Sequence, residues 1–318
     1  MKKKIIALTA GDPAGIGPEI AVKLIKRNHK SASIIVFGDL MVMLGAQRKF
    51  APGYAVVPVK DTRKIPRKKK IIPLYDLKNK NMSSVEAGKV SADAGRAAFS
   101  YIKAAINAAL KGDADAVLTA PISKEAFHRA GINYAGHTEI FAEMTKTKNY
   151  AMMLASGGLR VVLVTIHTAL TKVPGLLSTE KIYRVTALAD KALKKDFGIK
   201  APRIGIAALN PHAGENCAFG KEEENIIAPA VLKAKKAGIL ASGPFPSDTV
   251  FYRAVVKKEF DAVICMYHDQ GLIPVKLIGF ETGVNITLGL PIVRVSPDHG
   301  TAFDIAGTGR ASDLSMYE

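Results

Sequence analysis

Short apolar runs alternate with longer amphipathic stretches along the chain, a pattern typical of α/β proteins. Each apolar run has the length of a buried strand, and the amphipathic stretches repeat their apolar residues at helical spacing. In the first part of the chain we expect strands at residues 4–9, 33–37, 71–74 and 116–119. A helix is expected to begin at Pro18, and a long Ala-rich helix is expected at residues 91–111.

The alternation continues after residues 120–124, where we expect the chain to enter a second domain. Two apolar runs flank Ser156, Gly157 and Gly158, which predicts a β-hairpin. The remaining expected strands are at residues 150–154, 159–164, 203–209, 261–266, 284–287 and 292–295. Helices are expected at residues 140–144, 178–195 and 222–236, and a loop at residues 243–249 leads into another helix. The pattern therefore predicts an α/β fold with buried parallel strands.

The composition excludes some classes of protein. The chain has 318 residues, of which 48% are hydrophobic, enough for a full core. Its formal net charge of +17 raises the question of nucleic-acid binding. However, the lysines are spread over predicted helix faces, and the one dense block, residues 64–70, contains no aromatic side chains for base stacking. We expect a solvated basic surface, a pocket for an anionic ligand and no nucleic-acid partner.

The cysteine count and the apolar runs indicate the compartment. Cys217 and Cys265 form neither a disulfide framework nor a zinc ribbon. No apolar run approaches the length that spans a membrane, and residues 5–9 are too short for the core of a signal peptide. We therefore expect a cytoplasmic protein without a membrane partner.

A glycine-rich loop at residues 11–19 joins the first predicted strand to the first helix. This arrangement is able to bind a phosphate. Its spacing matches neither standard nucleotide-binding fingerprint, however, and a tight turn that requires glycine dihedral angles is favoured.

Three histidines each follow a predicted strand: His167, His212 and His268. Strand ends at the carboxyl edge of an α/β sheet are where ligands bind. Three imidazoles suit zinc and other divalent ions, with an open fourth position in catalytic sites. Asp248 and Asp269 would complete the ligand set, orient an imidazole or accept a proton. The alternative is that each histidine is a satisfied structural residue.

A second group of polar residues lies in or beside apolar segments: Lys276, Asn285 and Arg294. Arg294 would interrupt a buried strand without an anionic partner, and arginine is well suited to bind a carboxylate or phosphate through two hydrogen bonds. The alternative is a surface charge at a strand edge.

His137 and Thr138 precede a predicted helix. One interpretation is that Thr138 caps this helix and His137 has no role. The other is that both contact an anionic group of a substrate, helped by the free N–H groups of the helix.

Several motifs together resemble the 4-hydroxythreonine-4-phosphate dehydrogenase family, which makes part of the pyridoxine skeleton. They are residues 11–19, 136–139, 209–215, 266–271, 284–291 and 298–302. The resemblance extends in order over nearly the whole chain. It implies a two-domain α/β/α fold like that of isocitrate and isopropylmalate dehydrogenases, with the active site in the interdomain cleft at a homodimer interface. The implied domains are residues 1–122 with 290–318, and residues 123–289.

The resemblance also implies roles for individual residues. The metal ligands would be His167, His212 and His268, around a divalent ion shared across the dimer. Zinc is the preferred ion, with magnesium, cobalt and manganese as alternatives. The substrate would contact His137, Thr138, Lys276, Asn285 and Arg294. NAD or NADP would bind the loop that contains Asp298, His299, Gly300 and Thr301, which explains the missing dinucleotide fingerprint.

The implied reaction is oxidation of 4-hydroxythreonine 4-phosphate at its 3-hydroxyl, followed by decarboxylation to 3-amino-2-oxopropyl phosphate. Residues 119–126 partly resemble a sister branch that acts on 4-phosphorylated erythronate or threonate, which leaves that substrate as an alternative. A metal-dependent hydrolase and a non-enzymatic anion or nucleic-acid binder are the remaining alternatives, and the second gives no role to the three histidines.

Overall fold

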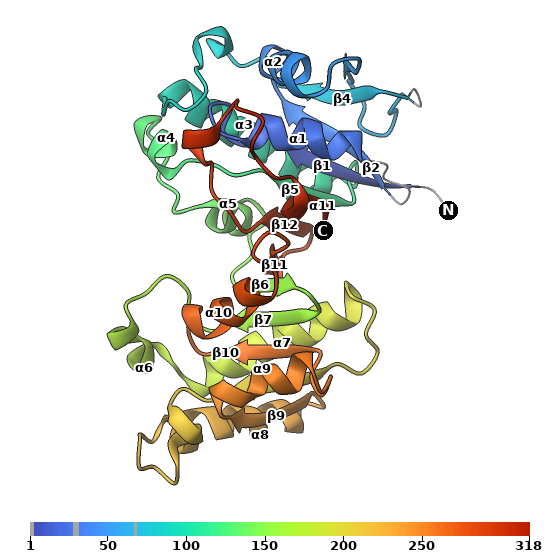
Figure 1. The fold of residues 1–318 in the computed structure, drawn as a ribbon. Helices are drawn as coiled ribbons and strands as arrows, with labels where there is room; N and C mark the ends of the chain where they lie inside the picture. The colour runs from blue at the N-terminus through green and yellow to red at the C-terminus, as the bar shows by residue number, and fades with distance from the viewer. Residues whose placement is uncertain (1–2, 28–31, 67–68) are drawn as a thin grey trace. The chain divides into compact units, whose positions relative to one another are not determined.

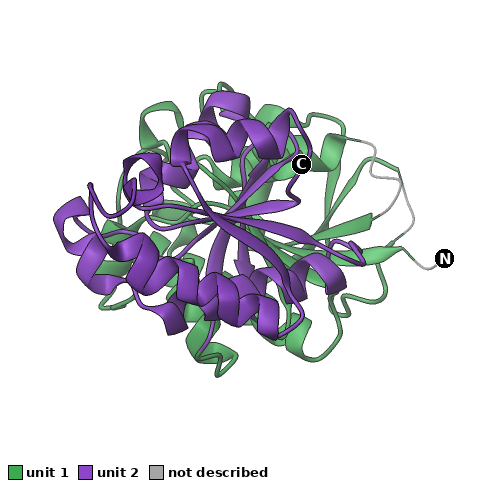
Figure 2. Cartoon of the chain, turned by 90° about the horizontal axis from the view of Figure 1, so that it is seen from below, with its two compact units in different colours: residues 1–148, 290–318 green, residues 149–289 purple. Residues whose placement is uncertain are grey.

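The computed structural model describes residues 3–27, 32–66 and 69–318, so two residues of the basic block 64–70 lie outside the described part. The chain forms two compact units, which Figure 2 shows in separate colours. The first comprises Met1–Lys148 and Leu290–Glu318, and the second comprises Asn149–Gly289. The first unit therefore extends to Lys148 instead of residue 122, because Phe127, Ile140 and Phe141 belong to its core. The first unit resumes at Leu290.

The first unit contains a sheet whose described strand pairs are all parallel, in the order β3-β4-β2-β1-β5-β12 (Figure 1). Its strands are β1 (Lys4–Thr9), β2 (Ala32–Gly38), β3 (Ala55–Pro58), β4 (Ile71–Asp76), β5 (Ala116–Thr119) and β12 (Val293–Pro297). Its helices are α1 (Gly17–Lys26), α2 (Leu40–Phe50), α3 (Ala92–Leu110), α4 (Lys124–Arg129), α5 (His137–Met144) and α11 (Leu314–Tyr317). Two 3₁₀ turns, η1 (Met82–Ser84) and η5 (Phe303–Ile305), complete it.

Local sequence signals account for the helices of this unit. Ser91 accepts a hydrogen bond from the Ala94 N–H at 3.2 Å and caps α3, and Ser123 caps α4 through the Ala126 N–H at 3.1 Å. The alanine-rich face of α3 lets this helix approach β1, β2 and β5 closely. Tyr101 on α3 is fully buried and donates its hydroxyl hydrogen to Asp39.

The second unit has a mixed sheet in the order β11-β6-β7-β10-β8-β9. Its strands are β6 (Ala151–Ser156), β7 (Leu159–Leu163), β8 (Arg203–Ala207), β9 (Leu240–Phe245), β10 (Ala262–Cys265) and β11 (Val284–Leu288). The pairs β11–β6 and β6–β7 are antiparallel, and β7, β10, β8 and β9 are parallel to one another. Gly157 and Gly158 turn the predicted hairpin with positive φ angles.

Helices cover both faces of this second sheet. They are α6 (Val173–Leu176), α7 (Thr179–Lys195), α8 (Ala228–Lys236), α9 (Ser247–Val255) and α10 (His268–Gly279). The 3₁₀ turns η2 (Leu170–Lys172) and η3 (Pro211–Gly214) and the π-helical segment η4 (Glu223–Ile227) join them. Alternate residues of the strands face opposite sides: Val162 and Ile264 pack with α7 and α8, whereas Val161 and Cys265 pack with α9 and α10. The unit is therefore a three-layer α/β/α structure.

The sequence pattern missed α2, β3, β9 and α10. Strand β9 contains Gly243 and Pro244, and α10 contains Gly271 and Pro274, so both carry residues that usually mark loops. In α10, His268 and Asp269 belong to the first turn of a helix instead of a loop. In the described part of the chain, no helix is long and apolar enough to cross a membrane.

Candidate active site

The three predicted histidines follow neighbouring parallel strands of the second unit. His167 follows β7, His268 begins the helix after β10, and His212 follows β8. Because these strands are parallel, their carboxyl ends lie at the same edge of the sheet. Hydrogen bonds link the ends of β7 and β10. The N–H and the hydroxyl of Thr165 both donate to the Met266 carbonyl, at 3.2 and 2.7 Å.

The structure brings His167 and His268 together. Their ring centroids are 5.2 Å apart, and both side chains line a cavity of about 280 Å³. Tyr267, Asp269 and Leu170 also line it. Two imidazoles at one cavity are a suitable start for a divalent-metal site.

Asp269 determines how His268 presents its ring. Its Oδ1 atom lies 2.7 Å from His268 Nδ1. A carboxylate accepts hydrogen bonds, so in the neutral imidazole this contact favours the tautomer with the hydrogen on Nδ1 and the lone pair on Nε2, the atom that would bind a metal. The contact agrees with Asp269 as the residue that orients His268.

His212 lies in an unusual loop. His212, Ala213, Glu215, Asn216 and Cys217 all have positive φ angles between 40° and 71°. Left-handed backbone costs on the order of 1–2 kcal/mol for each non-glycine residue, so the surrounding contacts must hold this loop in place. His212 is exposed, and its ring centroid is 6.3 Å from that of Phe219.

Glu223 supplies contacts that hold the start of this loop. Its buried carboxylate accepts hydrogen bonds from the N–H groups of Leu209 and Asn210, at 2.8 and 2.7 Å. Asn210 also donates its side-chain amide to Glu223, at 2.9 Å. The carboxylate packs so closely on Gly214 that a Cβ atom there would lie 2.8 Å from it.

The predicted three-histidine cluster is not complete within one chain. Across residues 3–27, 32–66 and 69–318, no three His, Cys, Asp or Glu side chains are close enough to hold one ion. The chemistry of the donors nevertheless fits: His167 and His268 are adjacent, and Asp269 orients one of them. Asp248 is exposed in the first turn of α9, after the neighbouring strand β9.

In the first unit, Arg294 is buried in β12 and is only 3% exposed. It donates to the hydroxyl of Thr119 at 2.9 Å, and its guanidinium lies 5.7 Å from the ring centroid of Phe141. Burial lowers the pKa of Arg294 to about 10, and nearby Glu139 opposes that change. The strand thus carries a buried cation, and a surface charge at a strand edge is excluded.

His137 lies close enough to Arg294 to be influenced by its charge. Burial, and then the positive charge of Arg294, lower the pKa of His137 well below its ordinary value, so the imidazole is neutral. Its Nε2 atom is buried, and none of the described residues hydrogen-bonds to it. Thr138 does not cap α5, because His137 is already the first helical residue and Gly136 occupies the N-cap.

The other two predicted substrate contacts belong to the second unit. Lys276 lies in the last turn of α10, with its ammonium 5.4 Å from the ring centroid of Phe280. Asn285 lies in β11, and its Oδ1 atom is buried without a hydrogen-bond donor among the described residues. A buried amide oxygen of this kind is ready to accept a hydrogen bond from a ligand.

The predicted cofactor loop, Asp298 to Thr301, packs on the N-terminal glycine loop. The Thr301 carbonyl accepts a hydrogen bond from the Ile16 N–H at 3.0 Å. A Cβ atom on Gly15 would lie 3.1 Å from Thr301, so glycine permits this close contact. Gly11 has a φ of 71°, which confirms that the turn needs glycine dihedral angles.

A cavity of about 360 Å³ lies beside the N-terminal glycine loop and helices α1 and α2. Gly15 and Gly307 line it, as do the apolar side chains of Met41, Phe50 and Met82. A cavity of this size, mostly apolar with a few polar groups, is typical of a small-molecule site.

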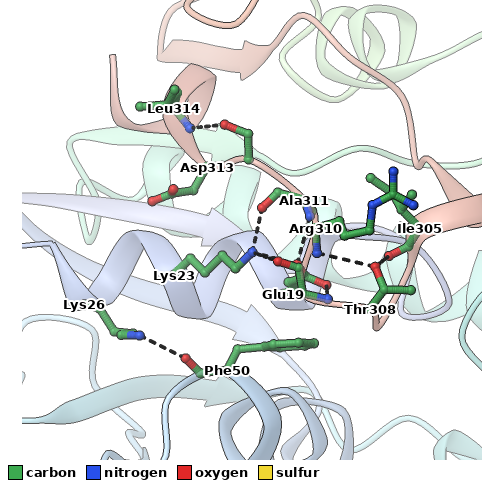
Figure 3. Close-up of polar contacts among 12 residues, drawn as sticks. Glu19, Lys23, Lys26, Phe50, Ile305, Thr308, Arg310, Ala311, Asp313 and Leu314 are labelled. Carbon is green, nitrogen blue, oxygen red and sulfur yellow. Dashed lines mark hydrogen bonds and ion pairs between the residues drawn. The ribbon is translucent and has the colours of Figure 1, made fainter.

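Glu19 and Lys23 of α1 hydrogen-bond to the chain segment that follows the predicted cofactor loop 298–301 (Figure 3). The buried carboxylate of Glu19 accepts the N–H groups of Gly309 and Ala311 at 3.2 and 3.0 Å. Lys23 pairs with Glu19 at 2.8 Å and donates to the carbonyls of Gly309 and Ala311, both at 2.7 Å. The N-cap residue Ile16 therefore holds Thr301, and Glu19 and Lys23 of α1 hold Gly309 and Ala311.

Sequence reasoning missed Glu19, Glu223 and Gln270, all of which are buried and hydrogen-bonded to backbone near predicted site residues. Gln270 alone carried a local signal, because it stands three residues after the N-cap of α10, where a capping box has Glu or Gln.

Comparisons with known proteins show which family the chain is similar to. Residues 30–318 match the family model described as "Pyridoxal phosphate biosynthetic protein PdxA". The chain is 46% identical over 321 residues to D-threonate 4-phosphate dehydrogenase of Salmonella typhimurium, covering 99% of this chain and 97% of that protein. It is 47% identical over 319 residues to 4-hydroxythreonine-4-phosphate dehydrogenase of Desulfosudis oleivorans, covering 99% and 93%.

Solved structures of proteins with the same family name also match this chain. The crystal structure of 4-hydroxythreonine-4-phosphate dehydrogenase from Klebsiella pneumoniae matches with a TM-score of 0.91 at 42% identity, over 99% of this chain and 97% of that one. A β-decarboxylating dehydrogenase from Thermococcus kodakarensis matches at 15% identity with a TM-score of 0.51, which concerns the fold alone. The predicted α/β fold and the dehydrogenase activity are confirmed. The chain belongs to the family of the pyridoxal phosphate biosynthetic protein PdxA.

Proposed function

We propose that this dehydrogenase uses NAD or NADP and a divalent ion to oxidise 4-hydroxythreonine 4-phosphate at its 3-hydroxyl. The resulting β-keto acid loses carbon dioxide and leaves 3-amino-2-oxopropyl phosphate. The observation that carries the proposal is the His167–His268 pair with Asp269 at one of its imidazoles.

The phosphate and carboxylate of such a substrate need cationic partners. Arg294 supplies a buried guanidinium, and the enclosed Nε2 atom of His137 supplies a neutral hydrogen-bonding group beside it. Lys276, Asn285 and Thr138 are proposed to bind the remaining polar groups of the same substrate. This set favours a small anion, because an uncharged analogue would forgo charge-assisted hydrogen bonds with the Arg294 guanidinium.

In the reaction, the hydroxyl oxygen loses a proton and carbon 3 loses a hydride. When bound, the divalent ion stabilises negative charge on the substrate oxygens, and the dinucleotide accepts the hydride. His167 and His268 are the proposed ligands, and Asp269 keeps Nε2 of His268 free for that role. Because Asp269 already engages His268, we propose exposed Asp248 as the first candidate to accept the proton.

The carbon–carbon bond to the carboxylate then breaks, and its electron pair moves toward the new ketone. A proton returns to carbon 2 when the resulting enol becomes the ketone product. For the dinucleotide, we propose that residues 298–301 bind it and that its adenine ring occupies the cavity lined by Gly15, Met41, Phe50 and Met82. Activity measured with NAD and with NADP in turn decides which dinucleotide the enzyme uses.

We propose that the working form is a homodimer whose second copy supplies His212 to each metal site. Helix α10 supports this proposal, since Ile273, Leu277 and Phe280 form an apolar stripe that is 67%, 86% and 74% exposed. A stripe of this size is typical of an interface. His268 begins the same helix, which would place a partner next to the imidazole pair.

Mixing inactive variants tests this arrangement. His212→Ala and His268→Ala are each expected to be inactive. If every site takes His212 from one copy and His268 from the other, half of a randomised mixture is mixed dimer, and each mixed dimer keeps one intact site. The mixture is then expected to regain roughly a quarter of the wild-type activity. No recovery after subunit exchange, checked by mass spectrometry, would assign all three ligands to one chain.

D-threonate 4-phosphate is the second candidate substrate, favoured by the 46% identity to the Salmonella typhimurium enzyme of that name. The two candidates differ in the group on carbon 2, which is an amine in one and a hydroxyl in the other. Steady-state cofactor reduction with 4-hydroxythreonine 4-phosphate, D-threonate 4-phosphate and D-erythronate 4-phosphate decides between them. A higher kcat/KM for D-threonate 4-phosphate would overturn the substrate assignment and leave the reaction class intact.

We also propose that the enzyme works in the cytoplasm and binds neither nucleic acid nor membranes. Two free cysteines, one of them buried in the core, support a reducing compartment.

A further inference from the structure

Gln270 lies at the centre of the strand ends that carry the candidate site. It is in the first turn of α10, two residues after His268, and its side chain is only 6% exposed. Each polar atom of its amide group has a partner, and these partners belong to three different segments of the second unit.

The first partner is local. Gln270 Oε1 accepts a hydrogen bond from the Met266 N–H at 2.5 Å, at the end of β10 and just before His268. A Gln in this position that accepts a backbone hydrogen bond at the start of its own helix resembles a capping box. Taken alone, this contact would make Gln270 a helix-stabilising residue.

The other two partners are distant in the sequence. Gln270 Nε2 donates to the Ala208 carbonyl at 2.6 Å and to the Ser247 hydroxyl at 2.8 Å. Ala208 follows β8 and leads into the loop of His212, and Ser247 is the neighbour of Asp248 at the start of α9. Ser247 also donates to the Ala208 carbonyl at 3.0 Å, which closes the network. Capping α10 does not require these contacts to Ala208 and Ser247.

We propose that Gln270 is a positioning residue that fixes the loop of His212 and the start of α9, with Asp248, relative to His268. Burial makes this network rigid, because an unsatisfied amide in this environment is costly. The inference rests on the proposed metal-dependent function: in each chain Gln270 would hold the loop that carries His212 to the partner copy's site, and the start of α9 with Asp248, against the strand end that carries His268. It assigns Gln270 no contact with substrate.

Two substitutions separate positioning from capping. Gln270→Glu keeps the acceptor for the Met266 N–H but loses both donors, and it places a carboxylate against the Ala208 carbonyl. Gln270→Met has a similar volume and loses all three contacts. Gln47→Met is the matched control, because Gln47 is a half-buried glutamine in the first unit whose amide donates to the Ala51 carbonyl at 3.1 Å.

The experiment uses the full-length dimeric protein after removal of metal with a chelator. Cobalt(II) is titrated into each variant, and binding is followed by calorimetry and by the visible spectrum of the bound ion. We expect Gln270→Glu and Gln270→Met to bind cobalt about 10–100-fold more weakly than the wild type, with a changed spectrum, as for other residues that orient metal ligands. Gln47→Met is expected to bind as the wild type does.

Backbone hydrogen exchange, measured by mass spectrometry without metal, supplies a second measurement. If Gln270 is a positioning residue, Gln270→Glu accelerates exchange at residues 208–213 and 247–250. Wild-type cobalt affinity together with unchanged exchange in Gln270→Glu would reduce Gln270 to a helix cap and overturn the inference. If wild-type protein binds no cobalt, the proposed metal function fails, and the exchange result alone decides the role of Gln270. Should Gln270→Met fail to fold, Ser247→Ala, which removes one partner, is expected to accelerate exchange at residues 247–250, and unchanged exchange there would count against the network.

Discussion

Replacing Asp12 with asparagine is expected to stabilise the protein at neutral pH. Asp12 lies in the N-terminal glycine loop and is only 1% exposed. Its Oδ1 atom accepts a hydrogen bond from the Ala14 N–H at 2.9 Å, whereas no described residue donates to Oδ2. Burial raises the pKa of Asp12 from 3.8 to about 6, against the opposing effect of the Ala14 hydrogen bond.

The sign of the effect follows from proton linkage. Between about pH 4 and pH 6 the folded protein binds the Asp12 proton more tightly than the unfolded chain does, so this group lowers stability as the pH rises. At about 1.36 kcal/mol per pKa unit, the full penalty above pH 6 is roughly 3 kcal/mol. Asparagine keeps the acceptor for the Ala14 N–H and carries no charge. The variant is therefore expected to be more stable by up to about 3 kcal/mol at pH 8 and to match the wild type near pH 4.

The assay is urea unfolding at a series of pH values and one protein concentration. Far-ultraviolet circular dichroism is the signal, because the chain contains no tryptophan. Half-buried Asp61 is the control of opposite sign: hydrogen bonding from the Arg63 N–H lowers its pKa, so Asp61→Asn is expected to bring no gain at pH 8. A stability difference between Asp12→Asn and wild type that is the same at pH 4 and pH 8 would refute the reasoning.

Three further substitutions test how the sites are held. Arg294→Met should reduce kcat/KM by about 100-fold or more through the loss of a charge-assisted contact, without lowering the melting temperature, because a buried charge is replaced by an apolar chain; a clear loss of stability with normal kcat/KM would contradict it. Glu19→Gln should raise the KM for the dinucleotide roughly tenfold with little change in kcat, since the segment after the cofactor loop loses a charged acceptor; an unchanged KM would count against this. Glu223→Gln should destabilise the protein by about 1–3 kcal/mol in urea unfolding and speed limited proteolysis at residues 210–220, because Oε1 can still accept from the Leu209 and Asn210 N–H groups but the Asn210 side-chain amide loses its acceptor Oε2; wild-type proteolysis would argue against Glu223 as the support of this loop.

Much of the fold was predictable from hydrophobic periodicity. Strands β1 and β5 lie where the pattern placed them because each is a continuous apolar run of strand length, and α3 does because its apolar residues repeat at helical spacing. Helix α10 was missed because Gly271 and Pro274 interrupt it. Gly271 has a packing reason, since a Cβ atom there would lie 3.0 Å from Leu163 and 3.1 Å from Cys265.

The candidate site was predictable as a set of residues but not as an arrangement. Strand-end positions placed His167 and His268 at one edge of a parallel sheet, and the structure brings them to one cavity. The left-handed backbone around His212 could not be foreseen, because Ala213, Glu215 and Cys217 have no preference for positive φ angles. Tertiary contacts from Glu223 stabilise it, and a contact between residues distant in sequence leaves no local pattern.

The most direct test of the central claim is formation of reduced nicotinamide with 4-hydroxythreonine 4-phosphate in metal-depleted protein before and after zinc is restored. We predict no reduction without metal, recovery on addition of zinc to the wild type, and no recovery in His268→Ala, whose unchanged circular dichroism would show a retained fold. Equal turnover with and without metal, or full activity in His268→Ala, would contradict the assignment of the imidazole pair as the metal site of this dehydrogenase.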